Sequence, residues 1–248
     1  MNLILIEPHE LDPTATVTLA DHRARHLLRV LKVNRGDSVR IGIIDGARGH
    51  AEVVDIAPAT VTLRCRYDDP GPELGSDILL LAFARPKVVL RCLEHATALG
   101  FGKIVLFRSR RVEKSHLSSH ALTPETLDEH IRRGLEQSRR TFRPSVVFVP
   151  RFRQLIEVEL ERLVPMENRF VADPDTDQEA ALAELPAKPL SVVIGPEGGL
   201  IDHELEQFSR SGFRLVSAGD APLRVETAVA YLTGQLRAAR SRSQSSSA

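Results

Sequence analysis

A short apolar run that ends in a glycine-rich loop constrains the fold more than any other part of this sequence. Val192–Ile194 read as a strand, Gly195-Pro-Glu-Gly-Gly199 follow, and a helix is predicted to begin at Asp202. Glycines at such a junction let backbone amides approach a ligand without intervening side chains. A second loop of this kind, Ser217–Thr227, lies further along the chain. The two loops predict either one shared nucleotide-type pocket or two ordinary strand-to-helix connections.

Strands and helices alternate from residue 78 onward. The strand candidates are Ile78–Phe83, Lys103–Phe107, Val146–Val149, Arg169–Ala172, Leu190–Ile194 and Phe213–Ser217. The helix candidates are Lys87–Leu99, Pro124–Arg139, Arg153–Leu163, Gln178–Glu184, Asp202–Arg210 and Glu226–Ala239. This order predicts an α/β domain with a mostly parallel sheet, helices on both faces and ligands at the carboxyl ends of the strands.

The first 70 residues predict a separate, small β-rich module. Its strand candidates are Asn2–Ile6, Ser38–Ile44, Gly49–Ile56 and Thr60–Tyr67, and Asp21 can cap a helix with an apolar stripe from Ala24 to Leu31. The turn-rich segment Asp68-Asp-Pro-Gly-Pro72 is the predicted linker. We expect domains at residues 1–70 and 74–240, and a disordered polar tail at 241–248.

Composition is that of an ordinary soluble protein, with 42% hydrophobic and 27% charged residues in a chain of 248. No apolar run approaches the roughly 20 residues that span a bilayer. Cys65 and Cys92 have no metal-ligand spacing and read as buried thiols in a reducing compartment. We therefore expect a cytoplasmic protein without a membrane segment or a metal.

The zero net charge hides an uneven distribution. Arg85–Arg153 contain 15 Lys/Arg against 6 Asp/Glu, whereas Gln154–Gln207 contain 3 against 13. One interpretation is a face turned toward a polyanion such as RNA. The other is a set of solvated helix faces whose charges pair with each other.

The glycine loop does not fit common phosphate-binding patterns. It lacks the lysine and Ser/Thr of a Walker A sequence, and no catalytic Ser-His-Asp order or His-x-x-x-His motif is present. This favours a neutral or cationic nucleoside-like cofactor held by backbone groups over a phosphate.

Ile194-Gly-Pro-Glu-Gly-Gly-Leu200 and Leu223-Arg-Val-Glu-Thr-Ala228 together resemble the signature of the ribosomal RNA small-subunit methyltransferase E family. The resemblance covers most of the chain, with related motifs at Arg85-Pro-Lys87, Ala98-Leu-Gly100, Arg111–Ser115 and Glu136-Gln-Ser138. His26–Leu31 and Asp45-Gly46 are similar to the amino-terminal PUA-like module of that family.

The resemblance implies an S-adenosylmethionine-dependent enzyme of the SPOUT superfamily that methylates N3 of a uridine in 16S rRNA of the small ribosomal subunit. It implies a PUA-like β-barrel that binds RNA, a trefoil-knotted α/β domain and a homodimer with cofactor pockets near the subunit interface. Two departures stand out: Ala221-Pro222 where the family has an arginine-containing loop, and Ala98 where many members have an acid.

Candidate cofactor contacts come mainly from backbone atoms and apolar side chains of the two loops and one strand end. They are Ala172, Ile194, Gly195, Pro196, Glu197, Gly199, Ser217, Ala218, Gly219, Leu223, Arg224 and Thr227. Glu197 could instead stabilise its own loop, and Thr227 could simply begin a helix.

Methylation of uridine N3 requires loss of a proton, so the site must assist that loss or stabilise negative charge on the ring. Arg224 and Glu226 are the candidate catalytic residues. Arg224 either orients a uracil oxygen or a phosphate, or forms a salt bridge to Glu226 or Glu197. Glu226 either acts on the substrate or, as we favour, caps the last helix.

Candidate RNA contacts form three clusters of basic residues, which would bind phosphates without reading sequence. They are Arg23, Arg25, Arg29 and Lys32; Arg108, Arg110, Arg111 and Lys114; and Arg139, Arg140 and Arg143. Two rival functions stay open: ribose 2′-O-methylation of rRNA or tRNA, and an RNA-binding or assembly protein without catalysis, which Ala221 would favour.

Overall fold

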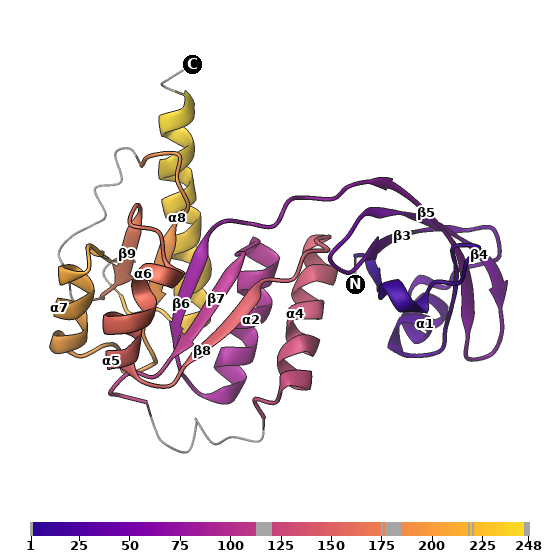
Figure 1. Cartoon of the computed structure of the whole chain (residues 1–248). Helices are drawn as coiled ribbons and strands as arrows, with labels where there is room; N and C mark the ends of the chain where they lie inside the picture. Colours follow the sequence, from indigo (N-terminus) through magenta and orange to yellow (C-terminus); the bar gives the residue numbers. More distant parts are fainter. Residues whose placement is uncertain are drawn as a thin grey trace. The chain divides into compact units, whose positions relative to one another are not determined.

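The computed structural model describes residues 2–112, 121–174, 176, 185–217, 219 and 221–245. For residues 242–245 it describes the backbone without the side chains. It divides into two compact units (Figure 1). Unit 1 comprises the residues up to Leu74 together with Ile131–Arg143, and unit 2 comprises Gly75–His130 and the chain from Pro144 onward.

Unit 1 is built on a five-stranded sheet in the order β1-β3-β4-β5-β2. The strands β1 and β3 are parallel and the other neighbours antiparallel. Its elements are β1 (Ile4–Ile6), the 3₁₀ turn η1 (Pro8–Glu10), β2 (Thr16–Leu19), α1 (His22–His26), the π-helical η2 (Leu27–Leu31), β3 (Ser38–Ile43), β4 (Arg48–Ile56) and β5 (Val61–Asp69).

Alternation along the strands produces the core of unit 1. Every second residue is buried from Gly49 to Val53 in β4 and from Val61 to Cys65 in β5, as expected for a sheet with one face toward a core. The buried side chains join Ala24 and Leu27 from the α1–η2 segment in one cluster. The Asp21 carboxylate accepts a hydrogen bond from the Arg23 N–H, so it caps α1 as predicted.

Unit 2 contains a six-stranded sheet in the order β11-β9-β10-β6-β7-β8, and all of its pairings are parallel. The strands are β6 (Ile78–Ala82), β7 (Lys103–Phe107), β8 (Ser145–Val149), β9 (Arg169–Ala172), β10 (Ser191–Ile194) and β11 (Arg214–Val216). The helical elements are α2 (Pro86–Leu99), α4 (Pro124–Ser138, shared with unit 1), α5 (Phe152–Gln154), η3 (Leu155–Glu159), α6 (Leu160–Leu163), α7 (Asp202–Arg210) and α8 (Val225–Ser245).

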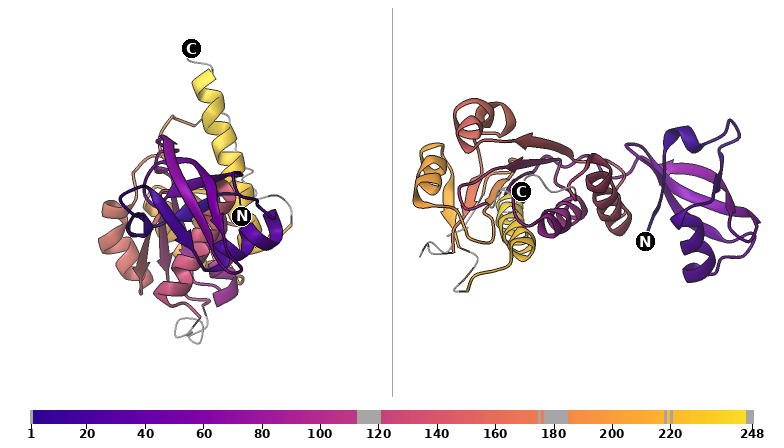
Figure 2. Two further views of the ribbon diagram at one scale, coloured as in Figure 1. Left: turned by 90° about the vertical axis from the view of Figure 1, so that its right-hand side faces the viewer. Right: turned by 90° about the horizontal axis from the view of Figure 1, so that it is seen from below.

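Helices cover both faces of this sheet (Figure 2). One core joins Leu79 and Leu81 of β6 to the buried residues of α2 and α8. The other joins Ile78 and Leu80 of the same strand to Leu160 and Phe208, on α6 and α7. Both faces of a central parallel strand are therefore buried, which explains the uninterrupted apolar run of β6.

A buried carboxylate ties α8 to the unit-2 sheet. Asp77, just before β6, is 3% exposed and accepts hydrogen bonds from Arg237 Nε at 2.8 Å and Arg240 Nη1 at 2.6 Å. The Leu190 N–H donates to the same carboxylate. Arg237 also donates to the Leu99 carbonyl oxygen at the end of α2, so one cluster positions both helices.

The predicted fold class, α/β with an amino-terminal β module, is confirmed; the trefoil knot stays a prediction. The sequence reading missed β2 and the membership of Ile131–Arg143 in unit 1. The expected helix at Arg153–Leu163 is broken into α5, η3 and α6, and the expected helix at Gln178–Glu184 lies outside the described residues. The segment 241–248, which was expected to be a disordered tail, is helical as far as Ser245, where α8 ends.

Neither unit offers a helix of the length and apolarity needed to cross a bilayer, within the residues described. The same residues hold no group of three or more His, Cys, Asp or Glu side chains placed to bind a metal ion.

Candidate active site

Three neighbouring strands end at the same edge of the unit-2 sheet and bring the two glycine-containing loops together. β9 lies between β10 and β11, with Val193 opposite Val171 and Val216 opposite Ala172. Because all three strands are parallel, their carboxyl ends and the loops that follow share one edge. The Asp173 N–H donates to the Val216 carbonyl oxygen and extends the β9–β11 ladder into this edge.

The loop after β10 has a tightly fixed backbone. Gly199 has a φ of +72°, and its N–H donates to the Pro196 carbonyl oxygen at 2.8 Å. A Cβ at Gly195 would lie 3.2 Å from the Leu200 backbone nitrogen, which is tighter than an ordinary contact, so the turn favours glycine at this position. Arg111 Nη1 donates to the Gly198 carbonyl oxygen at 2.6 Å and holds the loop from the segment after β7.

The loop after β11 is organised by Ser217 and Gly219. Ser217 Oγ donates to the Gly219 carbonyl oxygen at 2.8 Å, and Gly219 has a φ of +115°. The Ala228 N–H donates to the Arg224 carbonyl oxygen, which fixes the entry to α8. Ala218, a predicted cofactor contact, lies outside the described residues.

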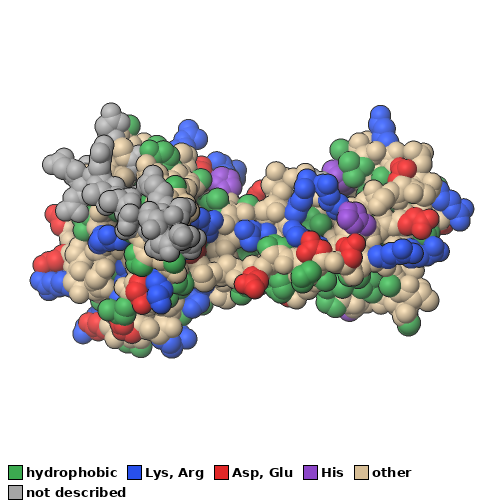
Figure 3. All heavy atoms as spheres, turned by 90° about the horizontal axis from the view of Figure 1, so that it is seen from above, with side chains coloured by type: hydrophobic (Ala, Val, Ile, Leu, Met, Phe, Trp, Pro, Cys, Tyr) green, Lys and Arg blue, Asp and Glu red, His purple; other side chains and the backbone are tan. Residues whose placement is uncertain are grey.

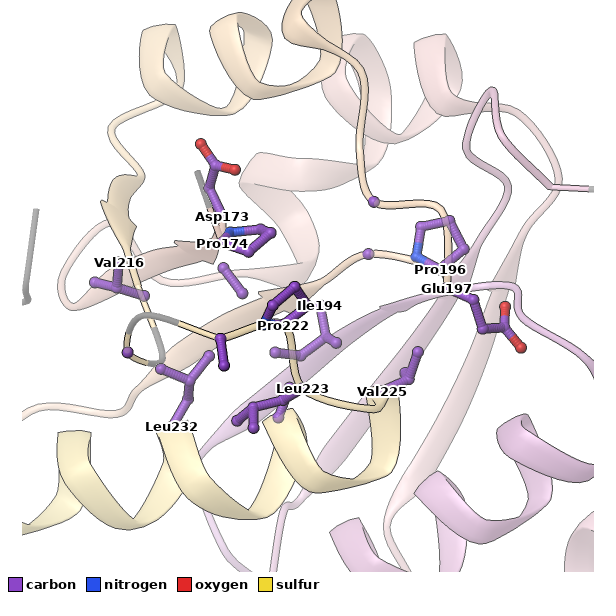
Figure 4. A pocket seen from close by; sticks show the side chains of 16 residues that line it. Asp173, Pro174, Ile194, Pro196, Glu197, Val216, Pro222, Leu223, Val225 and Leu232 are labelled. Carbon is purple, nitrogen blue, oxygen red and sulfur yellow. The ribbon is translucent and has the colours of Figure 1, made fainter. Parts of the chain in front are cut away.

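These loops enclose a pocket, here the inner pocket, of about 110 Å³, or about 640 Å³ when the space open to solvent is counted. Figure 4 shows Ile194, Pro222 and Leu223 close together, with Glu197 pointing away from them. Among the described residues, the lining includes Asp173 and Glu197 but no Lys, Arg or His. The lining residues are Ala172, Asp173, Pro174, Ile194, Gly195, Pro196, Glu197, Gly199, Val216, Gly219, Ala221, Pro222, Leu223, Val225, Ala228 and Leu232.

A second, wider pocket of about 950 Å³, here the outer pocket, shares the wall formed by Glu197, Pro222, Leu223 and Val225. It is predominantly basic: Arg85, Lys87, Arg91 and Arg224 line it, against Glu197 and Glu226. Its remaining lining residues are Pro86, Val88 and Ala121. An apolar pocket with acidic groups therefore adjoins a cationic one.

The two candidate catalytic residues, Arg224 and Glu226, lie on the wall of the outer pocket, and the salt bridge that was the alternative role for Arg224 is not formed with Glu226 or Glu197. Glu226 Oε1 accepts a hydrogen bond from Arg91 Nη1 of α2 at 3.0 Å. Arg224 is exposed and forms no ion pair with any residue that the structure describes. Its guanidinium is therefore available to an acidic or electron-rich ligand, while Glu226 holds Arg91 in place.

Glu197 connects the two pockets. Its carboxylate accepts a hydrogen bond from the Arg85 N–H at 3.2 Å, across the sheet edge between β10 and β6. This contact fits the alternative in which Glu197 stabilises its own loop.

Cys92 lies beneath this region and is fully buried. Burial, with the nearby charges of Glu226 and Glu197, raises its pKa to about 12. A thiol held in this state is a poor nucleophile, so covalent catalysis by Cys92 is excluded.

Eight of the predicted cofactor residues line the inner pocket: Ala172, Ile194, Gly195, Pro196, Glu197, Gly199, Gly219 and Leu223. Ser217 braces Gly219, Arg224 faces the outer pocket, and Thr227 is exposed on α8. The sequence reading missed Asp173, Pro174, Val216, Ala221, Pro222, Val225, Ala228 and Leu232. The pair Asp173-Pro174 directly follows a predicted strand, and this was the sequence signal that could have pointed to the pocket. Only the order of the strands, however, reveals that β9 ends between the two loops.

Arg23 is a correction to the predicted RNA contacts. It is 6% exposed, and its guanidinium donates to Glu10, Asp21 and the Leu5 carbonyl oxygen. A buried cation that is fully bonded in this way is part of the core of unit 1 and cannot reach a phosphate. Arg25, Arg29 and Lys32 are exposed, as an RNA contact requires.

The other predicted RNA contacts have mixed environments. Arg110 and Arg139 are exposed and Arg108 is half-buried, whereas Arg111 braces the glycine loop. Arg143 forms a salt bridge with Asp45. Arg140 is half-buried and takes part in an interaction, and Lys114 lies outside the described residues. On the face shown in Figure 3, Lys and Arg side chains are interspersed with Asp and Glu.

Similar proteins support the architecture. A family model described as an RNA methyltransferase domain matches residues 74–237, and one described as an RNA methyltransferase PUA domain matches residues 19–64. The chain is 30% identical to ribosomal RNA small subunit methyltransferase E of Treponema pallidum, over 92% of this chain and 87% of that protein. It is 23% identical to ribosomal RNA small subunit methyltransferase E 1 of Borreliella burgdorferi, over 92% and 94%.

A solved structure of ribosomal RNA small subunit methyltransferase E from Neisseria gonorrhoeae, bound to S-adenosyl methionine, has the same fold. It superimposes with a TM-score of 0.75 and 20% identity, over 97% of this chain and 98% of that one. The fold and the matched domains define an RNA methyltransferase with an amino-terminal PUA domain. The chain belongs to the ribosomal RNA small subunit methyltransferase E family, as its loop motifs predicted.

Proposed function

We propose that this chain transfers the methyl group of S-adenosylmethionine to N3 of a uridine in 16S rRNA of the small ribosomal subunit. The observation that carries the proposal is the contrast between two pockets that share one wall. The described lining of the inner pocket is mainly apolar and contains no cation, which is compatible with a positively charged sulfonium and disfavours a phosphate. The outer pocket has four basic side chains, which suit RNA.

The residues of the inner pocket fit an adenosyl group. Ile194, Leu223 and Leu232 provide an apolar surface for adenine, and Gly195 lines the pocket with no side chain between its backbone and a ligand. The inner pocket, at about 110 Å³, is smaller than the roughly 300 Å³ at which small-ligand sites begin. A bound ligand would therefore extend into the space that is open to solvent.

Bound S-adenosylmethionine would supply an electrophilic methyl group, and the chain would contribute mainly position and charge. Arg224 would bind a uracil oxygen and stabilise the negative charge that develops on the ring as N3 loses its proton. Arg85, Lys87 and Arg91 would hold neighbouring phosphates, with Glu226 fixing the guanidinium of Arg91.

Methyl transfer to isolated small ribosomal subunits tests the reaction. Labelled S-adenosylmethionine is supplied, the rRNA is digested to nucleosides, and 3-methyluridine is the expected product. A 2′-O-methylated nucleoside would replace the proposed reaction with ribose methylation. Absence of transfer, together with absence of heat on titration of the folded protein with S-adenosylmethionine, would indicate a non-catalytic RNA-binding protein.

We also propose a homodimer formed through α8. Every exposed residue from the start of α8 to Ala238 is uncharged, and most are small: Thr227, Ala230, Tyr231, Gly234 and Ala238. An exposed helix face is ordinarily rich in charge, whereas small residues let two helices approach closely.

Because the proposed substrate is ribosomal, we also propose that the reaction takes place in the cytoplasm.

A further inference from the structure

A row of basic side chains crosses the outer face of the unit-1 sheet. Arg40 of β3 lies opposite His50 of β4, and His50 lies opposite Arg66 of β5. All three side chains are exposed, while their strand neighbours Val39 and Cys65 are buried. Residues directly opposite in antiparallel strands share a face, so the three side chains form one continuous row.

The charge of this row is not neutralised within the part of unit 1 that the structure describes. Arg40, His50 and Arg66 form no ion pair there, and no carboxylate occupies the row. The next row of the same sheet differs, because Arg64 Nη1 lies 3.5 Å from Glu52 Oε2. One row is thus paired internally, and its neighbour is left to bind an anion.

A hollow of about 480 Å³ adjoins the row at Arg40 and His50. Arg139, which follows α4, adds a third basic side chain to its lining, and Leu31 contributes an apolar side chain that is 51% exposed. The other lining residues are Asn2, Leu3, Ile4, Ser38 and Val39, so no acidic side chain that the structure describes lines the hollow. The volume falls within the roughly 300–1,000 Å³ of small-ligand sites.

We propose that this row and hollow form an RNA-binding site in which Arg40, His50 and Arg66 contact phosphates of one strand and the hollow holds an unstacked nucleotide. Adjacent strands lie about 4.8 Å apart, so the row presents its side chains at the close, regular spacing of a repeating polyanion. Leu31 and the guanidinium planes of Arg40 and Arg139 offer surfaces against which a base can stack. The site rests on the proposed function in taking RNA as the substrate, and it lies in a different unit from the two pockets.

The double substitution Arg40→Ala/Arg66→Ala tests the phosphate contacts. Affinity for a small-subunit RNA fragment is measured by fluorescence anisotropy at several salt concentrations. We expect at least about a tenfold loss near 0.1 M salt and a salt dependence shallower by roughly 0.7–0.9 per arginine removed. Arg64→Ala is the matched control, because Arg64 lies on the same face but is paired with Glu52.

Leu31→Ala tests the hollow separately. It should weaken RNA binding about threefold to tenfold without changing the salt dependence, since a base contact releases no counterions. If the double variant and Arg64→Ala bind RNA alike with the same salt dependence, the site is disproved. Calorimetric affinity for S-adenosylmethionine should be unchanged in all three variants, so this outcome is distinct from a failure of the proposed methyl transfer.

Discussion

At the scale of single residues, Arg224 is the side chain on which the proposed chemistry depends most. It is exposed on the wall of the outer pocket, and it forms no ion pair with any described residue. The two carboxylates of the same pocket, Glu197 and Glu226, are bonded to Arg85 and Arg91 instead. Arg224→Ala should lower kcat about a hundredfold, the usual effect of losing one donor to a developing negative charge, and change the affinity for S-adenosylmethionine little. Single-turnover methyl transfer measures this. Arg210→Ala, which removes an exposed arginine of α7, is the control, and equal rates for the two variants would remove Arg224 from the mechanism.

Arg111 contacts the glycine loop, which its place in a predicted cluster of RNA contacts did not indicate. Its guanidinium donates to the Gly198 carbonyl oxygen, and its side chain lies beside Gly198 and Gly199. Arg111→Ala should loosen this loop and raise the Kd for S-adenosylmethionine about fivefold to tenfold, the loss of a charge-assisted hydrogen bond. Calorimetry checks the affinity. Arg110→Ala is the adjacent control, and the idea fails if only RNA affinity changes in Arg111→Ala.

Arg23 shows where prediction from sequence stops at this scale. Its place off the apolar stripe of α1 indicated a solvated side chain. The partners that bury it, Glu10 and the Leu5 carbonyl oxygen, come from a different part of unit 1. Helical periodicity describes one element and contains no information about groups that other elements bring to it.

At the scale of elements, the contact between α8 and the sheet is the most vulnerable. Asp77 is the common partner of Arg237 and Arg240, and the carboxylate is buried. Asp77→Ala should lower the free energy of unfolding by about 3–5 kcal/mol, because it leaves two partly buried guanidinium groups without their acceptor. Urea denaturation measures the change. Asp202→Ala, in the exposed first turn of α7, should cost under about 1 kcal/mol and serves as control.

The same carboxylate predicts a loss of stability in acid. Burial opposes ionisation of Asp77, but hydrogen bonds from Arg240 and the Leu190 N–H, with the charge of Arg237, lower its pKa below the ordinary value of 3.8. Its stabilising contribution is therefore fully present above about pH 5 and is lost as the pH falls through 3.8 toward the lower folded-state value. As the pH falls from about 5 through the lowered folded-state pKa of Asp77, the unfolding free energies of wild type and Asp77→Asn should converge. A difference that stays constant over this range would contradict the assignment.

The sequence predicted the elements that have local signals. α2 begins at Pro86 and ends at Gly100, whose φ of +79° fits a glycine that terminates a helix. The π-helical η2 and η3 and the short strand β2 have no comparable signal. The order of strands also escaped prediction, since β9 pairs with both β10 and β11 through contacts between distant segments.

At the scale of the whole molecule, the proposed RNA contacts lie in both units, whereas the proposed cofactor pocket lies in unit 2 alone. Both pockets of the active site lie in unit 2, and the row of Arg40, His50 and Arg66 lies in unit 1. Family motifs predicted the inner pocket because its glycine loops are contiguous in sequence. The row in unit 1 was not predicted, because its members are far apart along the chain and are brought together only by strand register.

The dimer proposed through α8 is testable at Gly234, which lies in the middle of the uncharged face. A Cβ at this position would meet nothing within 4 Å, so substitution leaves each subunit intact. Gly234→Glu should give a monomer in sedimentation equilibrium, because two carboxylates would face each other across a closely packed helix pair, and methyl transfer should fall at least about tenfold if the pockets lie near that interface. Gly234→Ala keeps the residue small and improves helix propensity, so it should stay dimeric and active. Dimeric Gly234→Glu would place any self-association on a different surface.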